Sequence, residues 1–296
     1  MRFDSYHPAI NLIYFSAAVF CAADFDHPCF IIIAWAGFFI YSFMLNGRKG
    51  LLFNLCLIPL VFLYGCIYAG YNHFGVTVIR ENIIGNMITL ESFVYGLTIG
   101  LRAAILLMIF SCVLSVFSSD KVVYLFGRIS PRLSLFLSII LRSQPLIKKM
   151  ASLINTARRG IGKGARQGSV LRRLRNTVGI FSILITCTVE SFGGTSASMK
   201  SRGFLLRGRS AYSIYRFDNR DRGFIISIVI CLAAVAAAAL LDQTVIYYDP
   251  EIIMNRVTPV SFVFYTAYAV FIMMPAVLQI WAEGRFKRPV PGIEEA

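Results

Sequence analysis

The sequence predicts an all-α polytopic membrane protein with about six transmembrane helices and long amphipathic helices on the cytoplasmic side. Hydrophobic residues make up 57% of the 296 residues, and the mean hydropathy is +0.69, values that suit lipid better than water. Only 15% of the residues are charged, yet the net charge is +14. Of the 29 Lys and Arg, 20 lie in residues 118–222, so the positive charge is concentrated in one internal block.

Six apolar runs are long enough to be predicted as membrane spans. The first is short and polar at its end. The runs cover about residues 9–23, 29–45, 51–70, 93–117, 223–241 and 259–281.

The charges of the connecting segments predict the orientation of these spans. The turn 46–50, the block 118–222 and the tail after the last span are basic, whereas the turn 24–28 is acidic. Because cytoplasmic loops carry an excess of Lys and Arg, both termini and the central block are expected in the cytoplasm. A multi-pass location in a cell membrane is the matching expectation.

The chain is predicted to have three parts. Residues 1–117 form the N-terminal transmembrane helices. Residues 118–222 form a cytoplasmic domain with two Arg-Gly-ended helices. Residues 223–296 form the C-terminal transmembrane helices and a short cytoplasmic tail.

The central block is predicted to contain two long helices. The first runs over about 132–159, is kinked at Pro145 and is closed by Gly160; the second runs over about 170–202 and ends at Gly203. Basic residues flank the apolar part of each, so both are expected at the membrane surface or packed on other helices. A crossing by the second helix would invert the topology after it.

Both helices end in an Arg-Gly pair, Arg159-Gly160 and Arg202-Gly203, about forty residues apart. Helix capping alone favours this pattern, because Arg interacts with the last carbonyls and Gly tolerates the conformation beyond them. A functional interpretation uses the same geometry. A guanidinium directed away from the membrane can form bidentate pairs with a soluble partner.

Four motifs occur in order on this topology. They are Thr89-Leu90-Glu91-Ser92, Arg142-Ser143-Gln144-Pro145, Ala157-Arg158-Arg159-Gly160 and Ser198-Met199-Lys200-Ser201-Arg202-Gly203-Phe204. Together they resemble the signatures of the transmembrane coupling (T) component of energy-coupling-factor (ECF) transporters, the family that includes the permease of cobalt importers. Arg158 and Lys200 depart from the usual residues beside the two arginines.

The resemblance implies a non-catalytic subunit of an ATP-driven importer of a vitamin or transition-metal ion. Such a subunit joins two cytoplasmic ABC-type ATPases to a small substrate-binding membrane (S) subunit. It binds no cofactor itself, and ATP and Mg belong to the partner ATPases. The residues expected to contact the ATPases are Ala157, Arg158, Arg159, Gly160, Ser201, Arg202 and Gly203.

Four further residues are expected to be structural or to contact a partner. Arg102 lies inside an apolar span, where a charge usually faces a polar contact, and Glu91 is its expected partner or a helix cap. Arg142 and Pro145 belong to the second motif.

Other functions are weighed on composition. The seven dispersed Cys and three His favour neither disulfides nor a metal site, and no nucleotide-binding or hydrolase motif occurs. The basic block is better explained by topology and lipid headgroups than by nucleic acid. A stand-alone secondary transporter remains the alternative, although no internal repeat supports it.

Overall fold

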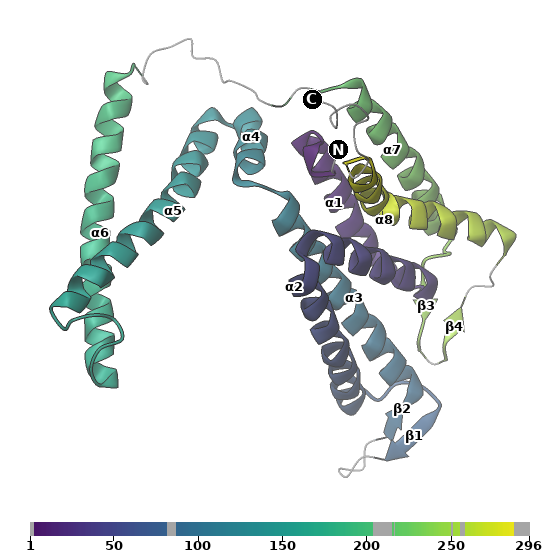
Figure 1. Cartoon of the computed structure of the whole chain (residues 1–296). Coiled ribbons are helices and arrows are strands. Elements are labelled where there is room, and N and C mark those ends of the chain that lie inside the picture. The colour runs from purple at the N-terminus through teal and green to yellow at the C-terminus, as the bar shows by residue number, and fades with distance from the viewer. Residues whose placement is uncertain are drawn as a thin grey trace, which may run out of the picture. The chain divides into compact units, whose positions relative to one another are not determined.

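The computed structural model describes residues 3–81, 87–203, 215, 217–249, 251–254 and 258–286. These residues form eight α-helices and two short antiparallel hairpins (Figure 1). The prediction of an all-α polytopic membrane protein is confirmed. The linker 204–214 and the tail 287–296, part of the predicted cytoplasmic segments, lie outside the described residues.

The chain divides into two compact units, 1–118 with 215–296 and 119–214. The first unit contains α1 (Pro8–Asp24), α2 (Pro28–Tyr71), α3 (Leu90–Val116), α7 (Asn219–Leu240) and α8 (Pro259–Phe286). Three of these helices begin at a proline, which suits the first helical position because its missing N–H would have no partner there.

Five helices of the described residues are long and apolar enough to cross a membrane: α2, α3, α7, α8 and α6 (Val170–Ser201). The runs predicted over 93–117, 223–241 and 259–281 are therefore confirmed as helices of spanning length, and the runs predicted over 29–45 and 51–70 both lie in the single helix α2. The first predicted span corresponds to α1, which has 17 residues and is shorter than these five. The surface location expected for α6 stays a prediction.

Helix α2 is 44 residues long and contains the two predicted spans that flank the turn 46–50. It is interrupted at Gly47, where φ is 57° and ψ is −137°, a conformation that only glycine adopts readily. At 1.5 Å per residue, the parts before and after Gly47 are about 28 Å and about 36 Å long, close to the thickness of a bilayer core.

Aromatic side chains fill the core of the first unit. The ring of Tyr14 lies 5.1 Å from that of Phe271, and its hydroxyl donates to the Ile272 carbonyl at 3.1 Å. Phe30 stands edge-on to Tyr268 with centroids 5.2 Å apart. These contacts join α1 and α2 to α8, and the buried hydroxyl is satisfied by a backbone acceptor.

Glycines allow α2 and α3 to approach closely. A Cβ added at Gly96 would lie 2.8 Å from the Cβ of Tyr68 and 3.2 Å from the Cα of Gly65. Small residues at such crossings are typical of membrane helices, where close van der Waals packing drives association.

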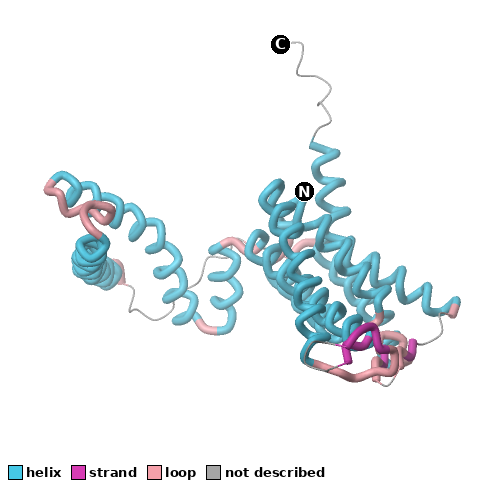
Figure 2. The backbone as a smooth tube through the Cα atoms, turned by 90° about the horizontal axis from the view of Figure 1, so that it is seen from below, coloured by secondary structure: helices cyan, strands magenta, loops and turns pink. Residues whose placement is uncertain are grey.

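Two short hairpins, which the sequence did not predict, connect the helices of the first unit. Strands β1 (Val78–Glu81) and β2 (Met87–Thr89) lie between α2 and α3, and β3 (Ile246–Tyr247) and β4 (Ile253–Met254) lie between α7 and α8. Figure 2 shows these strands in magenta, gathered at one end of the helices of this unit.

The second unit contains α4 (Ser119–Ile129), α5 (Pro131–Gly160) and α6. The turn from α4 to α5 is fastened by Ser134, whose hydroxyl donates to the Val123 carbonyl at 3.1 Å. The two long helices begin and end within one or two residues of the predicted positions, and α5 continues through Pro145. The prediction of two long helices in this block is confirmed.

Candidate functional site: two arginine-ended helices

The C-terminus of α5 is closed two residues later than the sequence indicated. Gly160 is still helical, and Gly162 takes the left-handed conformation with φ of 72°. The Gly162 amide donates to the Arg159 carbonyl at 3.1 Å, and the Lys163 amide donates to the Arg158 carbonyl at 2.9 Å. This pair of bonds is a Schellman cap. The expectation that Gly160 closes the helix is therefore wrong.

The two arginines of the α5 ending have different environments. Arg158 is half-buried, and its guanidinium lies against Gly179 of α6, because a Cβ there would be 2.7 Å from Nη1 and 3.0 Å from Nη2. Arg159 is exposed. Both were expected to contact a partner protein. In the structure Arg158 packs between α5 and α6, and of the two only Arg159 is exposed.

The turn between α5 and α6 is held by side-chain amides. Asn176 on α6 is buried, and its Nδ2 donates to the carbonyls of Gly164 and Gln167 at 3.1 and 3.4 Å. Asn155 on α5 accepts from the Ala165 amide at 3.1 Å. Because the turn is bonded to both helices, it fixes the end of α5 and the arginines on it.

The C-terminus of α6 matches the prediction. Arg202 is the residue at the end of the helix, and Gly203 takes the left-handed conformation with φ of 74°. The Gly203 amide donates to the Lys200 carbonyl at 3.0 Å, and the Ser201 hydroxyl donates to the Ser198 carbonyl at 2.9 Å. The Arg202 side chain is exposed, as is that of Lys200.

The two exposed arginines lie at opposite ends of the helix pair. Arg158 contacts Gly179 near one end, while Ile147 of α5 and Thr188 of α6 line the same small cleft further along, so the helices run antiparallel. Arg202 is 23 residues beyond Gly179, which at 1.5 Å per residue places it about 35 Å away. Arg159 and Arg202 are therefore too far apart to bind one small ligand together.

One face of α6 is apolar and uncovered in the second unit. Its residues recur every three or four positions along the helix and are between 42% and 82% exposed. They are Val170, Leu174, Val178, Phe181, Ile185, Val189 and Phe192. This apolar face of α6 lies away from Asn176 and Ile180, which are buried.

The second motif residues, Arg142 and Pro145, are both exposed on α5. Pro145 has no amide proton, so the Leu141 carbonyl loses its helical partner. The neighbouring Ser143 hydroxyl donates to the Ile139 carbonyl at 2.5 Å. No ion pair of Arg142 forms within the part of the chain that the structure describes.

The motif at residues 89–92 fastens a loop. Glu91 is 4% exposed and accepts from the Thr77 amide at 3.2 Å and from the Thr77 hydroxyl at 2.5 Å. The Thr89 and Ser92 hydroxyls both donate to the Phe74 carbonyl, the latter at 3.1 Å. All three side chains therefore hold the segment 74–77 against the start of α3.

Arg102 pairs with Asp26, in the turn between α1 and α2, rather than with Glu91 as expected. The two side chains are 23% and 27% exposed. Glu91 is already bonded to Thr77, and it lies eleven positions, or about 16 Å of helix, before Arg102. The expected Arg102–Glu91 pair is thus wrong, and Arg102 joins α3 to the α1–α2 turn.

Sequence reasoning missed a polar pocket between α2 and α3. It is lined by Asn46, Lys49, Gly50, Phe53, Ser111, Leu114 and Ser115. The basic turn 46–50 was recognised for its charge, but nothing in the sequence indicated which part of α3 lies beside it.

No family model matches this chain, and no match was found among curated proteins. The described residues also contain no group of three or more His, Cys, Asp or Glu side chains placed to hold a metal ion.

Proposed function

We propose that this chain is the transmembrane coupling subunit of an ATP-driven importer of the ECF type. It would join two cytoplasmic ABC-type ATPases to a small substrate-binding membrane subunit, and the complete importer would transport a vitamin or a transition-metal ion. The observation that supports this most is the pair of exposed arginines, Arg159 and Arg202, at the C-terminal ends of two antiparallel helices. Arg202 lies about 35 Å of helix beyond Gly179, the residue that Arg158 contacts, and this spacing suits two binding grooves rather than one.

The environment of Arg159 fits insertion into a groove on a partner. The neighbouring Gly160 is helical and exposed, and a Cβ added there would meet nothing within 4 Å. The backbone conformation at position 160 therefore does not require glycine in the absence of a partner. A bare last turn beside a guanidinium allows a partner backbone to approach closely, and a guanidinium can bind a carboxylate with two parallel bonds.

Arg202 fits a second groove for a related reason. It is exposed at the end of α6, where the left-handed Gly203 turns the chain away from the helix axis. The last carbonyls of the helix carry partial negative charge, which holds a cation near the helix end. The side chain can then reach beyond the helix toward a partner.

The apolar face of α6 offers a contact for the substrate-binding subunit. It runs from Val170 to Phe192, and the 22 residue steps between them correspond to about 33 Å of helix. An uncovered apolar stripe of this length is typical of a helix that packs against another membrane protein or against lipid. A movement of α5 and α6 driven by the ATPases would be passed on through this face.

In this proposal the chain provides binding surfaces and no chemistry. ATP and Mg would be held by the two ATPases, and the transported substrate by the small membrane subunit. The protein would lie in the bacterial cell membrane with both termini in the cytoplasm. The concentration of Lys and Arg in 118–222 supports that orientation.

The test is co-purification combined with uptake. Arg159→Ala and Arg202→Ala, made singly and together, should leave membrane insertion intact. Each single variant should weaken capture of ATPase subunits from the native membrane, and the double variant should abolish capture and uptake. Lys149→Ala is the control, because Lys149 is an exposed cation in the middle of α5, away from both helix ends. Normal uptake by the double variant would refute the proposal.

A further inference from the structure

The polar pocket between α2 and α3 lies at the ends of two membrane helices. Asn46, Lys49 and Gly50 come from the interruption of α2, and Ser111, Leu114 and Ser115 come from the last two turns of α3. Its volume is about 350 Å³. A pocket at helix ends, between long apolar helices, lies at the depth of the lipid headgroups.

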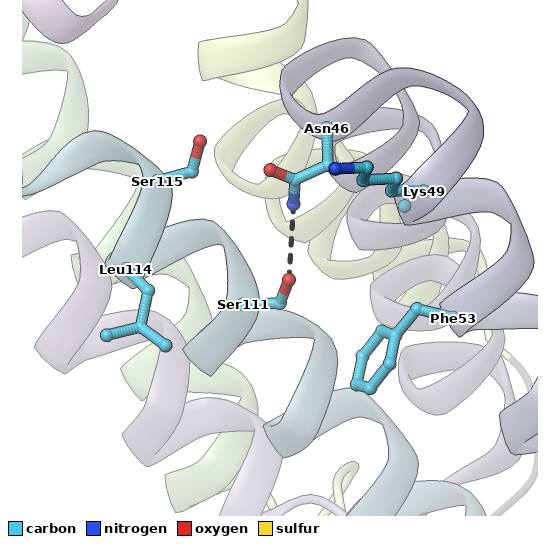
Figure 3. Close-up of a pocket in the computed structure, with 7 residues that line it drawn as sticks. Asn46, Lys49, Phe53, Ser111, Leu114 and Ser115 are labelled. Carbon is cyan, nitrogen blue, oxygen red and sulfur yellow. Dashed lines mark hydrogen bonds between the residues drawn. The ribbon is translucent and has the colours of Figure 1, made fainter. Parts of the chain in front are cut away.

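The interruption of α2 creates the pocket. Gly47 has positive φ, and a Cβ at Gly50 would lie 2.7 Å from the Ser42 carbonyl oxygen and 2.9 Å from the Asn46 Cβ. The chain can therefore turn tightly and place Lys49 beside α3. The Nδ2 of Asn46 donates to the Ser111 hydroxyl at 3.2 Å and fixes the two helices relative to each other (Figure 3).

The polar part of the pocket is built to bind an anion. Lys49 carries three ammonium donors, and its side chain reaches back toward Asn46 (Figure 3). Ser111 accepts the bond from Asn46, so its own proton is available to donate, and Ser115 presents a second hydroxyl at the edge. No Asp or Glu is among the seven residues that line the pocket. An ammonium with adjacent hydroxyls is a common arrangement for phosphate.

The other part of the pocket is apolar and continues onto the outer surface of the helices. Phe53 and Leu114 are 40% and 67% exposed. Beyond them, Leu52 and Phe110 are 68% and 60% exposed. A ligand with a phosphate at one end and hydrocarbon at the other would satisfy both parts.

We propose that this pocket binds the phosphate headgroup of an anionic phospholipid, with Lys49 and the Ser111 and Ser115 hydroxyls around the phosphate and acyl chains along Phe53 and Leu114. The site is formed by residues of the first unit alone. It would fix the α2 turn to α3 at the membrane surface and stabilise the protein in membranes rich in anionic lipid.

The experiment measures thermal unfolding of the full-length protein in a neutral detergent with added lipid. Phosphatidylglycerol should raise the unfolding midpoint, whereas phosphatidylcholine at the same concentration should raise it far less. Lys49→Gln should weaken the apparent affinity for phosphatidylglycerol about tenfold, the usual effect of losing one charged hydrogen bond. Arg48→Gln is the matched control, because Arg48 is adjacent and exposed but does not line the pocket.

A second variant and a second probe complete the test. Ser115→Trp should fill the mouth of the pocket from an exposed position and remove the phosphatidylglycerol effect even if Lys49→Gln folds poorly. Inorganic phosphate alone should produce no shift. If inorganic phosphate raised the unfolding midpoint as much as phosphatidylglycerol, the ligand of the pocket would be a free anion and not a lipid. Equal losses in Lys49→Gln and Arg48→Gln would show diffuse attraction to the basic turn, and either result overturns the proposal.

Discussion

The guanidinium of Arg158 on α5 lies against the backbone of Gly179 on α6. A Cβ at position 179 would lie 2.7 Å from Nη1, so the guanidinium would have to move if that residue were not glycine. This relationship separates the two arginines of the α5 ending into one that packs between helices and one, Arg159, that is exposed.

The effect of Gly179→Ala on the free energy of unfolding should therefore depend on whether Arg158 is present. In a helix interior, Ala is favoured over Gly by about 1 kcal/mol, but at position 179 this gain is offset by displacement of the guanidinium. In the Arg158→Ala background the gain should appear in full. A double-mutant cycle by denaturant unfolding in detergent should give a coupling of about 0.5–3 kcal/mol.

Gly194→Ala provides the control for this cycle. Gly194 is also helical on α6, and a Cβ added there would meet nothing within 4 Å. It should gain stability equally in both backgrounds. Additive effects at position 179 would contradict the described contact.

Alanine substitutions at Gly162 and at Gly160 should have opposite effects on the stability of the protein. Gly162→Ala should cost about 1–2 kcal/mol, since an L-residue is strained at positive φ. Gly160→Ala should be neutral or stabilising, because Gly160 is helical and unobstructed. Thermal unfolding separates the two. If the proposed function holds, Gly160→Ala should nevertheless weaken ATPase capture, a loss that its unfolding midpoint would not explain.

The Arg102–Asp26 pair should contribute to the stability of the first unit. Removing one partner, by Asp26→Asn or Arg102→Gln, should cost about 1–3 kcal/mol, because the ion pair is lost and the remaining partly buried charge is left without its partner. Asp120→Asn, at an exposed acid of α4, is the control. The pair would be without energetic effect if the double variant were as destabilised as the sum of the single variants.

His27 should make stability depend on pH. It is 1% exposed, and its Nδ1 accepts from the Cys29 amide at 3.3 Å, so the neutral ring carries its proton on Nε2, which faces the Tyr265 hydroxyl at 3.4 Å. Burial lowers the pKa of His27 below its usual 6.5. The unfolded chain therefore binds the proton more readily than the folded protein.

The contribution of neutral His27 to the free energy of unfolding is fully present above the ordinary pKa of about 6.5. It is lost as the pH falls from there through the lowered pKa of the folded protein, and the free energy of unfolding then decreases by up to about 1.4 kcal/mol per pH unit. Unfolding midpoints measured from neutral to acidic pH should show this fall. His27→Gln should flatten the curve, whereas a substitution of exposed His73 should not. An identical pH dependence in His27→Gln would assign the fall to other groups.

The predicted orientation can be tested by labelling with an impermeant thiol reagent in a Cys-free background. A cysteine at Lys163, in the α5–α6 turn, should be labelled only after the membrane is opened. A cysteine at Tyr71, 83% exposed at the end of α2, should be labelled from outside. The opposite pattern would reverse the topology.

The sequence predicted the features that depend on local signals. The ends of α5 and α6 follow from Pro131, the basic last turns and the glycines that follow them, and these are local effects. The choice of Gly162 over Gly160 was missed because both are near the end of the helix. The position of the left-handed glycine is set by two hydrogen bonds, from the backbone amides of Gly162 and Lys163 to the carbonyls of Arg159 and Arg158, and not by composition.

Long-range relationships could not be predicted in the same way. Asp26 is far from Arg102 in the sequence, and no periodicity indicated that the α1–α2 turn lies beside α3. The different roles of Arg158 and Arg159 depend on where α6 crosses α5, at Gly179. The pocket at Lys49 likewise needs the position of Ser111 on a neighbouring helix. The two hairpins are too short to produce a recognisable strand pattern.

The single-residue interruption at Gly47 has a consequence for how this part of the chain tolerates substitution. Because no loop residue separates the two halves of α2, their change of direction rests on one backbone conformation, with φ of 57° and ψ of −137°, that only glycine adopts readily. A side chain at this single position would therefore alter the angle between two long apolar helices at once.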